Sequence, residues 1–129
     1  MKIIRYMTVL LITIFSMAAY SQAKPYQALT LVDALKENKA PILFDVRTPS
    51  EFNSGHIEGA INIPFDQISQ RIDQILQFKD QLVVVYCRSG RRAQTATDTL
   101  EKEGFTELYD LTGHMIAWQK NSYPVVVQY

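Results

Sequence analysis

The chain has 129 residues, which is enough for one domain of ordinary size. Its 13 Lys and Arg residues balance 13 Asp and Glu residues, so the overall charge does not favour binding to nucleic acid or to an anionic membrane. A hydrophobic content of 47% and a charged content of 20% are those of a folded domain and exclude a disordered chain.

Residues 1–23 have the layout of a secretory signal peptide. Lys2 and Arg5 precede an uncharged run over residues 7–20, and small residues then suit cleavage after Ala23. Because this run is short against the roughly 20 residues of a bilayer-spanning helix, we expect cleavage and no stable membrane association. The protein is predicted to be exported to the periplasm or, alternatively, to the extracellular medium.

Residues 24–129 are expected to form a single domain and a monomer. They contain one cysteine, Cys87, which cannot form an internal disulfide. A free thiol in an oxidising compartment is a liability unless it is buried or used, so the residues around Cys87 decide its meaning.

Helices and strands are predicted to alternate along the first half of the domain. A capping-box spacing that begins at Thr30 predicts a short helix that ends near Asn38. The apolar run over residues 42–46 predicts a buried strand, and residues 51–54 follow as one helical turn. Residues 56–64 alternate between apolar and polar side chains and predict another strand, which stops at a proline.

The second half continues this alternation. Isoleucines at helical spacing, behind Asp66 as an N-cap, predict a helix over residues 67–77. Residues 82–86 form the clearest strand, because their only polar group is a tyrosine hydroxyl, as in a central parallel strand. A helix that ends at Gly104 and a strand over residues 105–111 come next.

A last short helix is expected to place Met115 and Trp118 in the core. The repeated order of strand and helix predicts an α/β fold, with a parallel or mostly parallel sheet that is covered on both faces.

Cys87 stands directly after the 82–86 strand and before a helix. Open α/β sheets bind ligands at the carboxyl ends of their strands, where loop amides and helix N-termini leave N–H groups unpaired. Such amides, the helix dipole and nearby guanidinium groups stabilise a thiolate, so we expect a lowered pKa for Cys87. The candidate site comprises the catalytic Cys87 and the substrate-binding residues Arg88, Ser89, Gly90, Arg91 and Arg92.

Four segments resemble the rhodanese family. Residues 45–52 and then 55–64 are similar to its amino-terminal signature, residues 87–92 to its active-site loop, and residues 111–118 with 123–125 to its closing segment. The resemblance extends over nearly the whole mature chain. It implies an open, mostly parallel five-stranded sheet with helices on both faces.

The resemblance also implies an activity. It predicts a sulfurtransferase that moves sulfane sulfur from thiosulfate, or a similar small anionic donor, to a thiol or cyanide acceptor through a persulfide on Cys87. Loop amides would hold the persulfide, the three arginines would orient the donor, and neither a metal nor an organic cofactor is needed.

Two other functions stay open. A persulfide-carrying module could take sulfur from a protein partner and deliver it. Phosphatase or arsenate-reductase chemistry occurs on the same scaffold, but related phosphatases use a loop that is longer by one residue. Here Arg92 lies five positions after Cys87, and Ala93 occupies the sixth, which favours sulfur over the larger phosphate.

Some polar residues outside the loop need separate interpretation. Where the family usually has a second glycine, this chain has His114, which either lines the pocket mouth or is exposed without a role. His56 falls in a segment that the family uses structurally, so we do not expect it to act as a base. Asp45, Arg47 and Glu51 are predicted to form a polar network that fixes the loop after the first long strand.

Overall fold

The computed structural model describes residues 23–129, and the predicted signal peptide up to residue 22 lies outside this range. The helices and strands in chain order are β1 (Lys24–Tyr26), α1 (Ala28–Lys36), β2 (Ile42–Asp45), α2 (Pro49–Ser54), β3 (Ile61–Asn62), the 3₁₀ segments η1 (Ile72–Gln74) and η2 (Leu76–Phe78), β4 (Leu82–Tyr86), α3 (Arg91–Lys102), β5 (Glu107–Leu111) and α4 (His114–Lys120).

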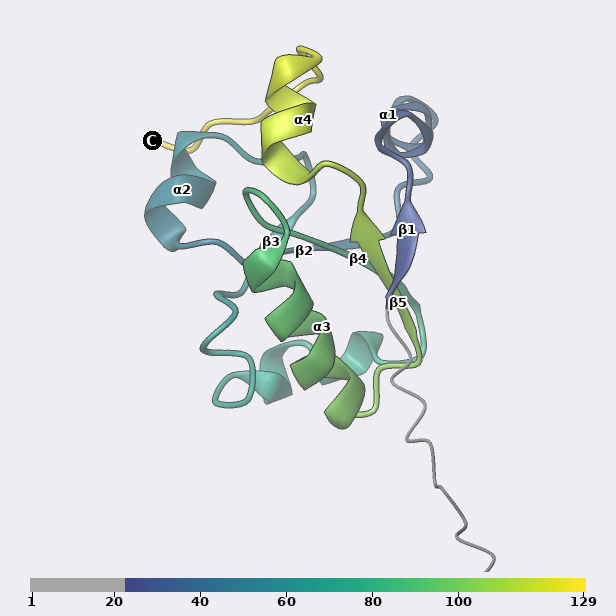
Figure 1. Cartoon of the computed structure of the whole chain (residues 1–129), viewed down its shortest axis with the longest axis vertical. Coiled ribbons are helices and arrows are strands. Elements are labelled where there is room, and N and C mark those ends of the chain that lie inside the picture. Colours follow the sequence, from purple (N-terminus) through teal and green to yellow (C-terminus); the bar gives the residue numbers. More distant parts are fainter. Residues whose placement is uncertain (1–22) are drawn as a thin grey trace, which may run out of the picture.

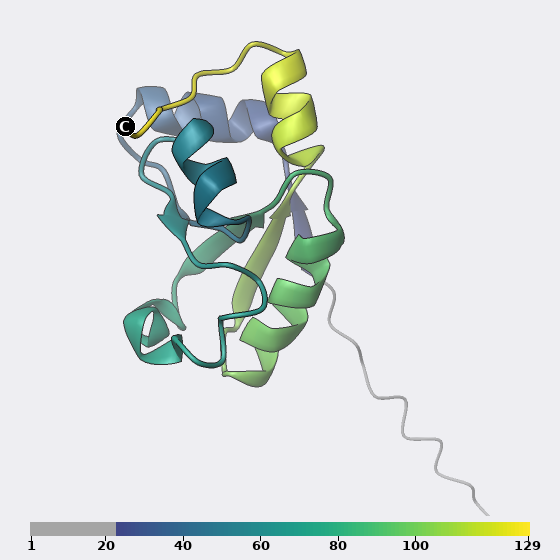
Figure 2. The same cartoon turned by 90° about the vertical axis from the view of Figure 1, so that its left-hand side faces the viewer.

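The five strands form one sheet in the order β1-β5-β4-β2-β3. Every neighbouring pair is parallel, so the predicted α/β fold is confirmed and the sheet is parallel throughout. The helices cover both faces, with α3 on one side and α1 and α4 on the other (Figures 1 and 2). Between residues 23 and 129, no helix is long and apolar enough to cross a membrane.

The central strand β4 is buried on both faces. Its residues 83–86 have no exposed surface, and successive side chains of a strand point to opposite faces. Val83 and Val85 therefore enter the core under α3, whereas Val84 and Tyr86 enter the core under α1 and α4. Because β4 is also the central strand in the sheet order, its carboxyl end lies in the middle of that edge of the sheet.

The predicted helix over residues 67–77 is wrong. The segment forms turns and the two 3₁₀ segments, in which Ile75 N–H donates to Ile72 O and Phe78 N–H donates to Ile75 O, both at 3.0 Å. A spacing of three residues brings these apolar side chains onto one face of a 3₁₀ turn, just as a wider spacing does in an α-helix. The apolar pattern therefore located the buried Ile68 and Ile75, but it did not define the helix type, and Leu76 is exposed.

The predicted start of the first helix is also wrong. Helix α1 begins at Ala28 with Gln27 as its N-cap, and no side chain caps it, so Thr30 lies inside the helix. The capping box belongs to α2 instead, where Glu51 N–H donates to Thr48 Oγ1 at 3.2 Å.

Two edge elements differ from the predictions. Only the short β3 forms within the predicted strand over residues 56–64, and His56 makes an isolated antiparallel bridge with Val126. The three-residue strand β1, which pairs with β5, was not predicted because so short a segment carries no alternating pattern. Strand β5 itself begins two residues later than predicted, since Phe105 packs into the core before the ladder starts.

Asp45 and Arg47 form a buried ion pair in the loop after β2. Arg47 Nη2 donates to Asp45 Oδ2 at 2.6 Å and to Gly55 O at 2.8 Å, and the Asp45 side chain has no exposed surface. The predicted network is confirmed for these two residues. Glu51 does not join it through a hydrogen bond and pairs with a different arginine.

We expect Asp45→Asn to lower the free energy of unfolding by about 3–5 kcal/mol, because it leaves the buried Arg47 guanidinium without a counter-charge. Urea denaturation measures the change. The exposed Asp80→Asn removes the same charge from the surface and should change stability by less than about 0.5 kcal/mol. Equal stability of the two variants would contradict this role for the pair.

Candidate functional site

The sulfur of Cys87 lies against the first turn of α3. Gly90 N–H donates to Cys87 Sγ at 3.0 Å, and Ala93 N–H lies 3.4 Å from the same atom. The first N–H groups of a helix have no partner within the helix and carry the positive end of its dipole. The structure therefore directs partial positive charge at Cys87 Sγ, as the sequence predicted for a thiolate.

Cys87 itself is only 1% exposed, whereas Arg88, Ser89 and Arg91 lie on the surface. The sulfur therefore lies beneath the surface, and we call the three exposed residues Arg88, Ser89 and Arg91 the loop rim.

Position 90 requires glycine for two reasons, its backbone conformation and the lack of room for a side chain. Its φ of 115° lies in the left-handed region, which side-chain-bearing residues rarely adopt. A Cβ atom at this position would also stand 3.0 Å from His114 Nε2. The loop can therefore pack against His114 only with glycine at this position.

His114 is buried behind the loop, with 4% of its surface exposed, so the alternative of an exposed histidine is wrong. Cys87 N–H donates to His114 Nδ1 at 3.1 Å. On the other side of the ring, Nε2 lies 3.2 Å from Asp110 Oδ2. Asp110 at the end of β5 was not among the predicted site residues, and its only signal in the sequence is the four-residue spacing to His114.

These contacts shift the pKa of both titratable groups. Burial would raise the pKa of the Cys87 thiol, but the His114 imidazole and the amides of Ala93 and Gly90 lower it to about 7. Burial would lower the pKa of His114, but Asp110 and the Cys87 side chain raise it to about 9. When Nδ1 accepts the Cys87 N–H it carries no proton, so this hydrogen bond belongs to the neutral form of the ring.

Arg92 is held by an ion pair and does not point freely into the site. Its Nη1 and Nη2 donate to Glu51 Oε1 and Oε2 at 2.7 and 3.0 Å. This bidentate pair, together with the Thr48 cap, lowers the pKa of Glu51 to about 2 although burial opposes the shift. Glu51 therefore ties α2 to the start of α3 across the loop.

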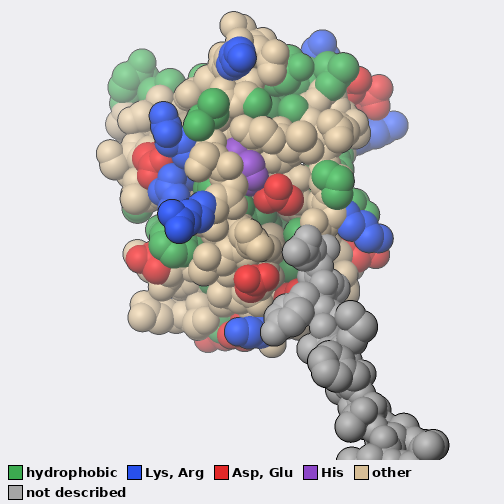
Figure 3. All heavy atoms as spheres, in the orientation of Figure 1, with side chains coloured by type: hydrophobic (Ala, Val, Ile, Leu, Met, Phe, Trp, Pro, Cys, Tyr) green, Lys and Arg blue, Asp and Glu red, His purple; other side chains and the backbone are tan. Residues whose placement is uncertain are grey.

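Arg88 lines a cavity of about 240 Å³ beside the loop. The same cavity is lined by Arg47, by Ser54 from α2 and by Gln119 from α4. In the view of Figure 3, basic side chains gather on one side of the molecular surface, next to a histidine. Guanidinium, hydroxyl and amide groups can all donate hydrogen bonds to a small oxyanion.

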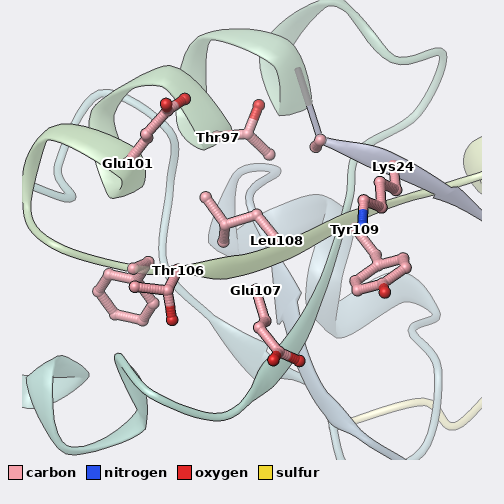
Figure 4. A pocket seen from close by; sticks show the side chains of 9 residues that line it. Lys24, Thr97, Glu101, Thr106, Glu107, Leu108 and Tyr109 are labelled. Atoms are coloured by element: carbon pink, nitrogen blue, oxygen red, sulfur yellow. The ribbon is translucent and has the colours of Figure 1, made fainter. Parts of the chain in front are cut away.

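A larger cavity of about 270 Å³ lies at the amino ends of β1 and β5 (Figure 4). Its labelled side chains include Lys24, Glu101 and Glu107, and no residue of the Cys87 loop lines it. Within residues 23–129, no group of three or more His, Cys, Asp or Glu side chains is placed to hold a metal ion. The arrangement that can carry chemistry is thus the thiol loop at the carboxyl end of β4.

Several known proteins are similar to this chain in sequence. A "Sulfurtransferase" of Allochromatium vinosum is 36% identical over 97 residues, which cover 75% of this chain and 89% of the relative. The "Thiosulfate sulfurtransferase PspE" of Escherichia coli K12 is 36% identical over 86 residues, covering 67% and 83%. The "Uncharacterized protein YqhL" of Bacillus subtilis is 46% identical over 76 residues, and the match spans only 59% of either protein.

Solved structures show the same fold. The crystal structure of a rhodanese-related protein from Thermoplasma volcanium matches with a TM-score of 0.70 and 28% identity, covering 81% of this chain and 99% of that one. The family model of the rhodanese-like domain matches residues 28–121, from the start of α1 to just beyond α4. Since this match includes the sheet from β2 to β5 and the whole thiol loop, the chain belongs to the rhodanese-like domain family.

Proposed function

We propose that the protein is a sulfurtransferase whose Cys87 accepts sulfane sulfur from thiosulfate, or a similar small anion, and passes it to a nucleophile. The observation that carries the proposal is the convergence of Gly90 N–H and Ala93 N–H on Cys87 Sγ. Donors that stabilise a thiolate also stabilise the terminal sulfur of a persulfide anion. The names of two relatives, a sulfurtransferase and a thiosulfate sulfurtransferase, support the reaction class.

The proposed cycle has two displacements. The Cys87 thiolate attacks the outer sulfur of thiosulfate, the bond between the two donor sulfurs breaks, and sulfite leaves with the electron pair of that bond. An acceptor nucleophile then attacks the outer sulfur of the persulfide, and the Cys87 thiolate leaves. No net oxidation occurs, because the sulfane sulfur is only transferred.

The burial of Cys87 favours a small donor. With 1% of the residue exposed, the sulfur leaves little room for a bulky donor. Arg88 and Arg91 belong to the loop rim and would meet a dianion first, while Arg92 stays bound to Glu51 and holds the loop in place. In this proposal two of the three loop arginines attract the donor, and the third is structural.

We also propose export, because the layout of residues 1–23 suits a cleaved signal. N-terminal sequencing of the protein recovered from its natural host should begin at Lys24. A chain that retains Lys2 and Arg5 would overturn this proposal without affecting the activity.

Replacing Cys87 with Ser should abolish sulfur transfer, since an alcohol cannot form a persulfide. With thiosulfate, the wild-type protein should gain the mass of one sulfur atom on Cys87 and release sulfite when cyanide is added. Cys87→Ser should do neither. Sulfite release by Cys87→Ser would disprove the proposed nucleophile.

The same assay separates the alternatives. Wild-type protein that is persulfidated as purified but does not turn over thiosulfate would favour a delivery module. Turnover of an aryl phosphate would indicate a phosphatase.

Replacing Arg88 with Ala should raise the KM for thiosulfate roughly 10- to 150-fold with little change in kcat, because a charge-assisted hydrogen bond contributes roughly 1.5–3 kcal/mol and Arg88 meets the donor before the reaction. Lys102→Ala removes an equal charge from the far end of α3 and serves as the matched control. A KM that is the same in both variants would exclude Arg88 from donor binding.

A further inference from the structure

Asp110, His114 and Cys87 form a continuous chain of contacts. The Asp110 carboxylate lies 3.2 Å from His114 Nε2, and His114 Nδ1 lies 3.1 Å from the backbone nitrogen of Cys87. Both ring nitrogens therefore face a partner inside the protein. When the carboxylate accepts the Nε2 proton, the electron pair of Nδ1 accepts the hydrogen bond from the Cys87 backbone N–H.

The backbone conformation and the close packing at His114 hold its ring in one position. This residue has a φ of 52°, in a region that is uncommon for side-chain-bearing residues. Gly90 presents no Cβ to the imidazole, and an added one would stand 3.0 Å from Nε2. The ring is thus held between the thiol loop and β5 at some conformational cost.

We propose that His114 is a positioning residue whose ionisation is coupled to that of Cys87, and that Asp110 orients the imidazole. The inference rests on the proposed function, because it concerns the ionisation of the same nucleophile. In one state the thiol is protonated and neutral His114 accepts the Cys87 N–H at Nδ1. In the other, the thiol has lost its proton, the imidazole has gained one and has released the Cys87 N–H, and the charge of the imidazolium stabilises the thiolate.

The pKa directions agree with coupled ionisation, since each group shifts the other toward its charged form. Other charged groups also act on this pair. Arg92 on α3 interacts with the thiolate by charge and is itself paired with Glu51 on α2. Arg88 and Arg91 stand at the loop rim, on the solvent side of the sulfur.

Thiolate formation, followed by its ultraviolet absorbance against pH, tests the proposal. In His114→Asn the midpoint should rise by about one pH unit or more, which is a tenfold loss of thiolate well below the midpoint. Asparagine tolerates the left-handed backbone and can still accept the Cys87 N–H, so it keeps the position and removes only the exchangeable proton. Asp110→Asn should give a smaller shift in the same direction.

Asp98→Asn is the matched control. Asp98 lines the same cavity as Asp110 and Gly90, about 190 Å³ in volume, and no hydrogen bond joins it to His114. The variant should leave the midpoint unchanged. A midpoint in His114→Asn equal to that of the wild type would overturn the proposal.

The reciprocal measurement does not depend on any His114 variant. Coupling free energies between two titrating groups are symmetric, so Cys87→Ser should lower the pKa of His114, followed by NMR of its ring proton, by an amount similar to that by which His114→Asn raises the pKa of Cys87. An unchanged His114 titration in Cys87→Ser would also overturn the proposal. Thiosulfate turnover is scored separately, because its absence from the wild type would disprove the proposed function and leave the proton coupling intact.

Discussion

The hydrogen bonds from Gly90 and Ala93 to the sulfur of Cys87 depend on the place where β4 ends. Because β4 is buried on both faces and paired on both edges, it cannot shift without disturbing both halves of the core. The turn after it is tight enough for α3 to begin beside the sulfur only because Gly90 adopts a left-handed conformation. A buried strand, a glycine in the left-handed conformation and a helix start thus create one electropositive point.

Most charged side chains around that point are held in pairs of opposite charge. Arg47 is neutralised by Asp45 inside the protein, and Arg92 is held by Glu51 across the loop, so both guanidinium groups stabilise the scaffold. Asp110 likewise pairs with His114, through the ring nitrogen that faces away from the Cys87 backbone. The exposed Arg88 and Arg91 are left to meet an anion at the loop rim, which separates the attraction of a donor from the activation of the sulfur.

The sequence predicted the architecture well wherever a segment was long and buried. Strands β2 and β4 and helix α3 were located to within a few residues, because uninterrupted apolar runs and helical spacing reflect burial directly. The three-residue β1 and the two-residue β3 are defined by their neighbours in the sheet and not by their own pattern. The segment over residues 67–77 forms 3₁₀ turns that pack Ile68 and Ile75 against the core residues of β2, β4 and α3.

The sequence by itself determined that a cysteine follows a buried strand and precedes a helix, with glycine and arginines between, since these are local features of neighbouring residues. Only the tertiary structure decided which partners those residues meet. Arg92 and Glu51 are 41 positions apart, and His114 is 27 positions from Cys87, so their contacts arise from the packing of α2, α3 and α4 around β4. Whether a charged side chain binds a substrate or a neighbour is therefore decided by the fold, because distances between remote residues are not written in their spacing along the chain.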